Sequence, residues 1–252
     1  MSRCAGAIPL GFISGAILLA ACVEIPTGAD DVLSLEIKSL PSPSVVAGDT
    51  LRDSTGLVAP VRITAFNFSG EEIATPAARF FAVDAGISVD SLTGIVRGDS
   101  VRTSARILVS LEGLNATVPI AVTLRPDTVT LSNGRDSLSY SLTDTTANVS
   151  PAIGVKVLHG VAAADSAVVS YFVSFRVVSP TTAGLAQLVD DNRRASSADT
   201  TDAGGIASRR IKLDPAKLLT VTDSVIVEAS VKYRGVNIKG SPAKLVLKVK
   251  PK

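Results

Sequence analysis

Ala105-Arg106-Ile107-Leu108-Val109-Ser110-Leu111 is the stretch that decides the fold, because every second residue in it, counted from Ala105, is apolar. A second run, Val118 to Leu124, follows after Gly113 and Asn115. Successive side chains of a strand point to opposite faces, so a pattern of period two buries one face and leaves the other in water. The two runs therefore predict a pair of neighbouring strands joined by a short turn.

The same alternation recurs along the chain, separated by Gly, Pro, Asn, Asp and Ser at the spacing of sandwich strands. Valine, serine and threonine are abundant, tryptophan is absent and aromatic residues make up 4% of the 252 residues. Abundant β-branched residues favour strands, and no convincing amphipathic helix follows the N-terminal segment. We therefore predict an all-β chain. Further strands are expected at 33–38, 61–65, 167–178, 225–233 and 243–249.

A domain boundary is predicted at Arg125-Pro126-Asp127, where one strand ends and the alternating pattern later restarts. Proline cannot donate to a strand ladder, so it interrupts simple continuation of the sheet. Each half has roughly seven short strands, which fits two β-sandwiches in tandem better than one barrel. The predicted organisation is a signal segment over 1–21, a tether over 22–31, a first sandwich over 32–126 and a second over 127–252.

Three segments of the second half carry more specific expectations. Asn133-Gly134 lies between two short alternating runs, a pattern typical of a tight hairpin. Asp190 to Gly205 is rich in Asp, Ser, Thr, Ala and Gly, and we expect a long connection with at most a short strand. The closing run is locally basic, with Lys244, Lys248, Lys250 and Lys252, and its alternation with Leu245, Leu247 and Val249 predicts the solvent face of a final strand.

The first half resembles a bacterial Ig-like domain of the group-2 type, associated with intimin and invasin. The matching stretches are Val45-Val46-Ala47-Gly48-Asp49-Thr50, Val61-Arg62-Ile63-Thr64-Ala65-Phe66 and Val89-Asp90-Ser91-Leu92-Thr93-Gly94-Ile95-Val96-Arg97-Gly98. The second half is more loosely similar to a group-1, invasin-type Ig domain over Thr201-Asp202-Ala203-Gly204-Gly205-Ile206-Ala207. These resemblances imply two Ig-like β-sandwich domains used for spacing, adhesion or assembly at the envelope, and no catalysis.

The N-terminus reads as an export signal. Arg3 supplies a positive charge, Ala5 to Ala21 form an apolar core, and small residues stand at its end. The closing tetrapeptide Leu19-Ala20-Ala21-Cys22 resembles the lipobox of bacterial lipoproteins. The resemblance implies cleavage before Cys22 and fatty acylation of that cysteine, with palmitate among the expected chains. An ordinary secretory signal and an uncleaved membrane helix remain as alternatives, although Pro9 and Gly11 interrupt the run.

The charge balance and the cysteine content of the chain limit the kinds of partner that it can be expected to bind. Lys and Arg number 25 against 23 Asp and Glu, a net charge of +2, and this balance argues against nucleic acid. The two cysteines are Cys4, in the segment expected to be removed, and Cys22, so no disulfide is expected. Expected partners are the membrane, through the lipid on Cys22, and an unidentified envelope or surface protein. Val23 lacks the aspartate that retains some lipoproteins at the inner membrane, so the outer membrane is favoured.

Few residues are candidates for catalysis or metal binding, and we expect neither enzymatic activity nor a bound cofactor. His159 is the only histidine, and its place in an alternating run predicts a residue at a strand end instead of a catalytic base. Phe80-Phe81 is the one aromatic doublet, and its two rings should face opposite sides of a strand. An alternative function is binding of glycan or calcium through the loop 190–205, and its weak candidates for metal ligands are Asp190, Asp191, Asp199 and Asp202.

Overall fold

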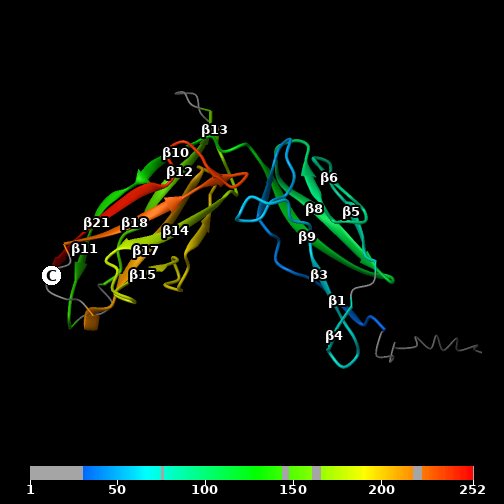
Figure 1. Ribbon diagram of the computed structural model, residues 1–252, viewed down its shortest axis with the longest axis horizontal. Helices are drawn as coiled ribbons and strands as arrows, with labels where there is room; N and C mark the ends of the chain where they lie inside the picture. Colours follow the sequence, from blue (N-terminus) through cyan, green and yellow to red (C-terminus); the bar gives the residue numbers. More distant parts are fainter. Residues whose placement is uncertain (1–30, 75–76, 144–147, 161–165, 218–222, 252) are drawn as a thin grey trace, which may run out of the picture.

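The computed structural model describes residues 31–74, 77–143, 148–160, 166–217 and 223–251. Within these ranges the regular secondary structure consists of strands and one short 3-10 turn at Pro215–Lys217, joined by turns and loops. The strands form two β-sandwiches that follow one another along the chain (Figure 1). The prediction of an all-β protein with two β-sandwiches in tandem is therefore confirmed.

The first sandwich holds strands β1 to β9. One face is the sheet β1-β3-β4 and the other is the sheet β2-β9-β8-β5, with β6 and β7 as a separate antiparallel pair. The strand pair expected from the sequence is β8 and β9, joined by a turn at Glu112 and Gly113. The bounds are β1 Ser34–Ile37, β2 Ser44–Val46, β3 Ile63–Phe66, β4 Glu72–Ile73, β5 Arg79–Ala82, β6 Ile87–Val89, β7 Val96–Gly98, β8 Arg102–Leu111 and β9 Leu114–Thr123.

The second sandwich holds strands β10 to β21. Its two main sheets have the orders β10-β12-β17-β15, with β13 beside β12, and β11-β21-β18-β14-β16. A small hairpin, β19 with β20, completes it. The bounds are β10 Thr128–Asn133, β11 Arg135–Tyr140, β12 Ile153–His159, β13 Ser166–Ala167, β14 Phe172–Ser179, β15 Ala186–Val189, β16 Ala198–Thr200, β17 Ile206–Leu213, β18 Ser224–Ser230, β19 Lys232–Tyr233, β20 Val236–Asn237 and β21 Ala243–Pro251.

Both sandwiches divide their first strand between the two sheets. In the first, β1 pairs antiparallel with β3 while β2 pairs parallel with β9. In the second, β10 pairs antiparallel with β12 while β11 pairs parallel with β21. The predicted hairpin at Asn133-Gly134 is therefore wrong, because the chain crosses there from one sheet to the other. Strand partners far along the chain decide the pairing, and the Val246 amide donates to the Gly134 carbonyl at 2.8 Å.

A second expectation needs a smaller correction. The run 167–178 was expected to be one strand, but it breaks between β13 and β14 at Ser170, whose φ is +58°. The Ser170 amide donates to the Thr201 carbonyl at 2.8 Å. The break shifts the alternation, so that Val168 is buried as well as Val173 and Phe175. The loop 190–205 contains one short strand, β16, as expected.

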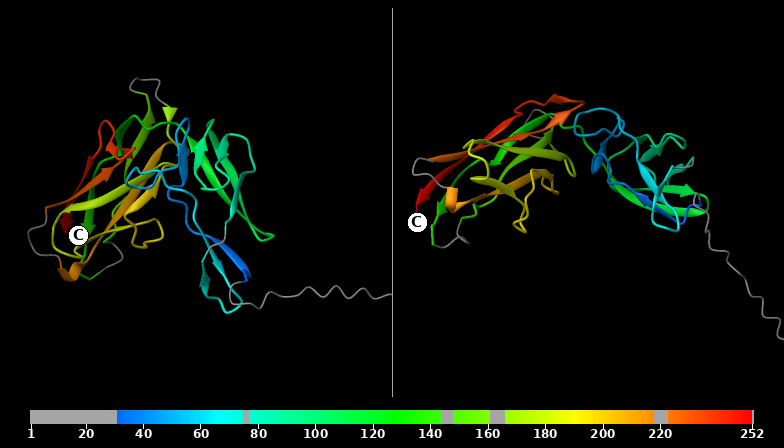
Figure 2. Two further views of the ribbon diagram at one scale, coloured as in Figure 1. Left: turned by 45° about the vertical axis from the view of Figure 1, so that its right-hand side comes forward. Right: turned by 60° about the horizontal axis from the view of Figure 1, so that its bottom comes forward.

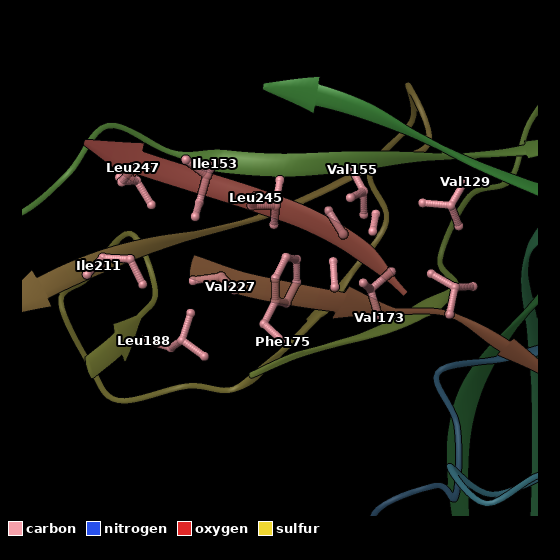
Figure 3. Close-up of a cluster of buried hydrophobic side chains, with 14 of the residues drawn as sticks. Val129, Ile153, Val155, Val173, Phe175, Leu188, Ile211, Val227, Leu245 and Leu247 are labelled. Atoms are coloured by element: carbon pink, nitrogen blue, oxygen red, sulfur yellow. The ribbon is translucent and has the colours of Figure 1, made fainter. Parts of the chain in front are cut away.

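Each sandwich has its own apolar core. Side chains between Val32 and Val122 form one cluster, and side chains between Val129 and Leu247 form the other. Figure 3 shows the second cluster, in which Phe175 and Val227 from one sheet face Ile153 and Val155 from the other. Burial of these alternating apolar faces is the main force holding each sandwich together.

The two sandwiches are arranged end to end. The views in Figures 1 and 2 agree that they meet at one end of each and do not lie side by side. The described chain enters at the end of the first sandwich that is far from the second. It leaves at the end of the second sandwich that is far from the first. The two ends of the described chain are therefore at opposite ends of a bent molecule.

Candidate functional site at the junction of the two sandwiches

The linker between the sandwiches is hydrogen-bonded to the second sandwich, and we call this set of contacts the linker clasp. Asp127 Oδ2 accepts a hydrogen bond from the Gly160 amide at 2.9 Å, and the Asp127 amide donates to the Leu158 carbonyl. Arg125 Nε donates to Asp127 Oδ1 at 2.7 Å. These bonds tie the linker to the end of β12, so the short connection does not act as a free hinge.

His159, the only histidine, is part of this clasp. It ends β12, and its Nδ1 lies 2.9 Å from the Arg125 carbonyl oxygen and 2.8 Å from Asp127 Oδ2. Burial alone would raise the pKa of Asp127, but the Gly160 amide, Arg125 and His159 hold it below its usual range. The expectation that His159 lies at the end of a strand is confirmed, and its neighbours are linker atoms.

A carboxylate of the first sandwich is the centre of the contact between the two. Asp49 is 5% exposed. Within its own sandwich it accepts hydrogen bonds from the Thr50 amide at 2.8 Å and from Arg52 Nε and Nη2 at 3.1 and 3.0 Å. From the second sandwich, Arg234 Nε donates to Asp49 Oδ2 at 2.9 Å. One buried carboxylate therefore joins two arginines across the junction.

The electrostatics of this group favour its charged form. Burial would raise the pKa of Asp49, but hydrogen bonds from Arg234, Arg52 and the Thr50 amide hold it well below the usual range. The same contact raises the pKa of the Arg234 guanidinium. Arg234 also lies over the Tyr233 ring, 5.3 Å from its centroid, in a cation–π arrangement. Asp49 is therefore ionised across the range in which proteins are normally folded.

Two turns meet tip to tip beside this ion pair. In the first sandwich the Gly56 amide donates to the Asp53 carbonyl, closing a turn whose glycine has φ +91°. In the second, Gly235 with φ +80° lies between β19 and β20. A Cβ atom added at Gly56 would overlap the backbone nitrogen of Gly235, and one added at Gly235 would come within 2.8 Å of the Thr55 carbonyl oxygen. Glycine is needed at both positions for the backbones to approach this closely.

A cleft of about 320 Å³ lies between the sandwiches, next to the ion pair. Two of the chain's three tyrosines, Tyr171 and Tyr233, line it together with Ser44 and Lys232. The Tyr171 hydroxyl donates to the Lys232 carbonyl at 2.7 Å, and burial raises the pKa of that phenol. This contact holds Tyr171, the residue before β14, against the β19–β20 hairpin, so the cleft wall is part of the junction.

The solved structures that are similar to this chain share little sequence with it. No family model matches this sequence, and no curated protein matches it. Among solved structures, domains 4 and 5 of the S-layer protein SbsC are similar over 87% of this chain and 98% of theirs, at 13% identity and a TM-score of 0.32. The Yersinia pseudotuberculosis adhesin InvE is similar over 86% of this chain and 58% of its own, at 18% identity and a TM-score of 0.35. Bacteroides uniformis β-glucuronidase 3 is similar over 86% of this chain and 24% of its own, at 14% identity and a TM-score of 0.30.

The four carboxylates singled out in the loop 190–205 are not gathered into one set. Each has its own protein partners, and among the described residues no three His, Cys, Asp or Glu side chains form a group able to hold a metal ion. The partners are the Arg194 amide for Asp190, the Arg210 guanidinium for Asp191, the Arg209 guanidinium and the Ser208 amide for Asp199, and the Gly204 and Ile206 amides for Asp202.

The predicted lipidation site lies outside the described residues. Leu19-Ala20-Ala21-Cys22 precedes residue 31, where the described chain begins. Within the described part of the chain, no helix has the length and apolar character that crossing a membrane requires. The signal, the cleavage and the acylation of Cys22 therefore stay predictions.

Proposed function

We propose that this chain is a lipid-anchored protein of the bacterial envelope with a structural or adhesive role and no catalytic one. In this proposal Cys22 carries the acyl chains, and the second sandwich is the part presented for contact. The observation that carries it is the end-to-end arrangement, in which the chain enters at one end and the second sandwich lies at the other. A spacer needs its attachment and its contact surface at opposite ends.

The junction supports this role because it resists bending at two places. The linker is bound to β12 through Asp127, and Asp49 binds Arg234 on the other side of the junction. Two attachments restrain the angle between the sandwiches more than one does, because a rotation that keeps one contact strains the other. Interfaces between domains usually permit relative motion unless they are extensive. The charged contacts here restrain that motion without a large apolar interface.

The tether would leave room for this arrangement at a membrane surface. From Cys22 to the start of β1 at Ser34 the chain can reach at most about 40 Å. Each buried methylene contributes about 0.8 kcal/mol, so stable anchoring requires more than one acyl chain on the cysteine. The expected address is the outer membrane, and the expected partner is a protein of the envelope or surface.

The test is intact-mass analysis of the protein purified from host membranes. A mature chain that starts at Cys22 and carries acyl chains is the expected result. Cys22→Ser should abolish acylation and move the protein to the soluble fraction, whereas Cys4→Ser should change neither. Acylation that persists in Cys22→Ser, or an unmodified soluble wild type, would contradict the anchor.

A further inference from the structure

Charge is distributed unevenly between the two sandwiches. Residues 125–252 contain 17 Lys and Arg against 11 Asp and Glu, a net charge of +6, while residues 32–124 contain 7 against 9, a net charge of −2. The near-neutral total of the whole chain conceals this difference. The positive charge is concentrated in the sandwich that lies farthest from the start of the described chain (Figure 1).

Part of this charge lies in one row on the outer face of a sheet. Lys244, Lys248 and Lys250 are exposed on β21, where they alternate with the buried Leu245 and Leu247 and the half-buried Val249. On the neighbouring edge strand, β11, Arg135 is exposed and stands opposite Val246 in the parallel register. Arg135 therefore occupies the level between Lys244 and Lys248. The four cations, which we call the basic row, occupy four successive levels of the same face.

The basic row has a regular spacing. A strand rises about 3.3–3.4 Å per residue, so levels two residues apart are about 7 Å apart and the row is about 20 Å long. No salt bridge joins any of the four cations to another described residue. The one carboxylate on this part of the face, Glu228, stands opposite Lys244 but is bound by Arg176 at 2.9 Å. The charges of the row are therefore free to meet a ligand.

Hydroxyl groups stand beside the lysines. Ser137 and Ser224 are the two register partners of Lys248, and Ser139 is the partner of Lys250. A serine hydroxyl both donates and accepts hydrogen bonds, whereas a lysine ammonium is a compact charge with three donors. The face therefore combines positive charges at regular intervals with short groups that can bond to sugar hydroxyls.

We infer that the basic row binds an extended acidic polysaccharide, with anionic groups at the lysines and sugar hydroxyls at the serines. A single file of charges about 20 Å long fits a linear polymer better than the plane of an anionic membrane. Single-stranded nucleic acid is bound through stacking on exposed rings, and the described residues of this face include one aromatic ring, Phe172, which is half-buried and lines the cleft at the junction. The inference concerns the ligand of the second sandwich and does not depend on acylation of Cys22.

The test measures binding of the purified full chain to immobilised polygalacturonate, with neutral dextran as the uncharged control polymer. Binding is expected in about 50 mM salt and should weaken steeply toward about 200 mM, because charge contacts release counterions. The triple substitution Lys244→Gln, Lys248→Gln and Lys250→Gln should weaken binding at low salt at least about tenfold. All three side chains are exposed, so the melting temperature should stay near the wild-type value.

A matched control separates the row from net charge. Lys156→Gln, Lys212→Gln and Lys239→Gln remove the same charge from the same sandwich, with Lys156 on β12 and Lys212 on β17 in the opposite sheet. This variant should retain binding within about threefold of the wild type. An equal loss in both variants, no binding at low salt, or tighter binding to single-stranded DNA or to phosphatidylglycerol vesicles would each overturn the inference. Acylation is read separately by mass, so failure here and failure of the anchor are distinguishable.

Discussion

At the scale of single residues, the junction depends on side chains whose contacts cannot be predicted from the sequence pattern around them. Asp49 follows Gly48, whose φ is +79°, so its place in the sequence indicates a turn and no partner in the other sandwich. Its cross-sandwich partner, Arg234, is 185 residues away in sequence. A pairing across that distance leaves no periodic signal in one sequence, so the sequence alone does not predict the junction.

Replacing the carboxylate should weaken the junction. Asp49→Asn keeps the size of the side chain but removes the charge that Arg52 and Arg234 share. The Asp49 side chain is buried, and hydrogen bonds that involve a charged group contribute about 1.5–3 kcal/mol, so the free energy of unfolding should fall by an amount of that order. Denaturant unfolding at neutral pH measures it.

An exposed ion pair in the same sandwich supplies the control for Asp49→Asn. Lys38 and Glu72 lie 3.5 Å apart, with side chains 53% and 61% exposed. Exposed pairs contribute about 0–1 kcal/mol, so Lys38→Gln should have a small effect on unfolding. If Asp49→Asn were as mild as Lys38→Gln, Asp49 would not hold the junction together.

Predictions for single residues are confirmed where the alternation within one strand is enough to determine which side chain is buried. Phe80 is 6% exposed and Phe81 46% exposed, as alternation on a strand requires. The pattern identified the two faces of β5 without knowledge of its neighbours. It identified neither the partner of Asp49 nor the clasp around His159, because both depend on contacts between distant segments.

At the scale of elements, strands were easier to predict than their pairing. Period two located β8 and β21 close to their observed bounds. It placed the start of β9 four residues too late, and the run 225–233, predicted as one strand, is divided between β18 and β19. It did not show that the segment around Gly134 crosses between sheets, because a tight hairpin and a crossing both require turn residues between two short alternating runs. Pairing is decided by β12 and β21, which follow much later in the chain.

The close contact between the turns at Gly56 and Gly235 leads to a prediction about the junction. Gly56→Ala places a methyl group against the backbone of Gly235 and should force the two sandwiches apart. Gly70→Ala is the matched control, because Gly70 also has a positive φ, +76°, but has no atom within 4 Å of an added Cβ. Both variants carry the cost of a left-handed conformation, about 1 kcal/mol.

The difference between these two alanine variants isolates the contact at the junction. Small-angle scattering should show a changed angle between the sandwiches in Gly56→Ala and the wild-type profile in Gly70→Ala. Identical scattering from the two variants would mean that the turns do not determine how the sandwiches meet.

At the scale of the whole molecule, a fixed angle gives an end-to-end protein a defined reach. The basic row lies on the second sandwich, and the described chain begins at the far end of the first (Figure 1). A loose linker would let the row sample many positions relative to the attachment. A restrained junction instead presents it in one direction, which lowers the entropy lost when a long polymer binds.

The angle should be insensitive to pH over the neutral and mildly acidic range. The pKa of Asp49 is lowered in the folded chain, so its stabilising contribution is present above the usual carboxyl pKa of about 3.9 and is lost only as the pH falls through the folded value. Spin labels at Ser69→Cys and Ser139→Cys, in a chain with Cys4 and Cys22 replaced by serine, report the distance between the outer ends of the two sandwiches. One narrow distribution is expected at pH 7 and again at pH 5, and a broader one in Asp49→Asn at both values. A wild-type distribution that broadens between pH 7 and pH 5 would show that a group other than Asp49 controls the junction.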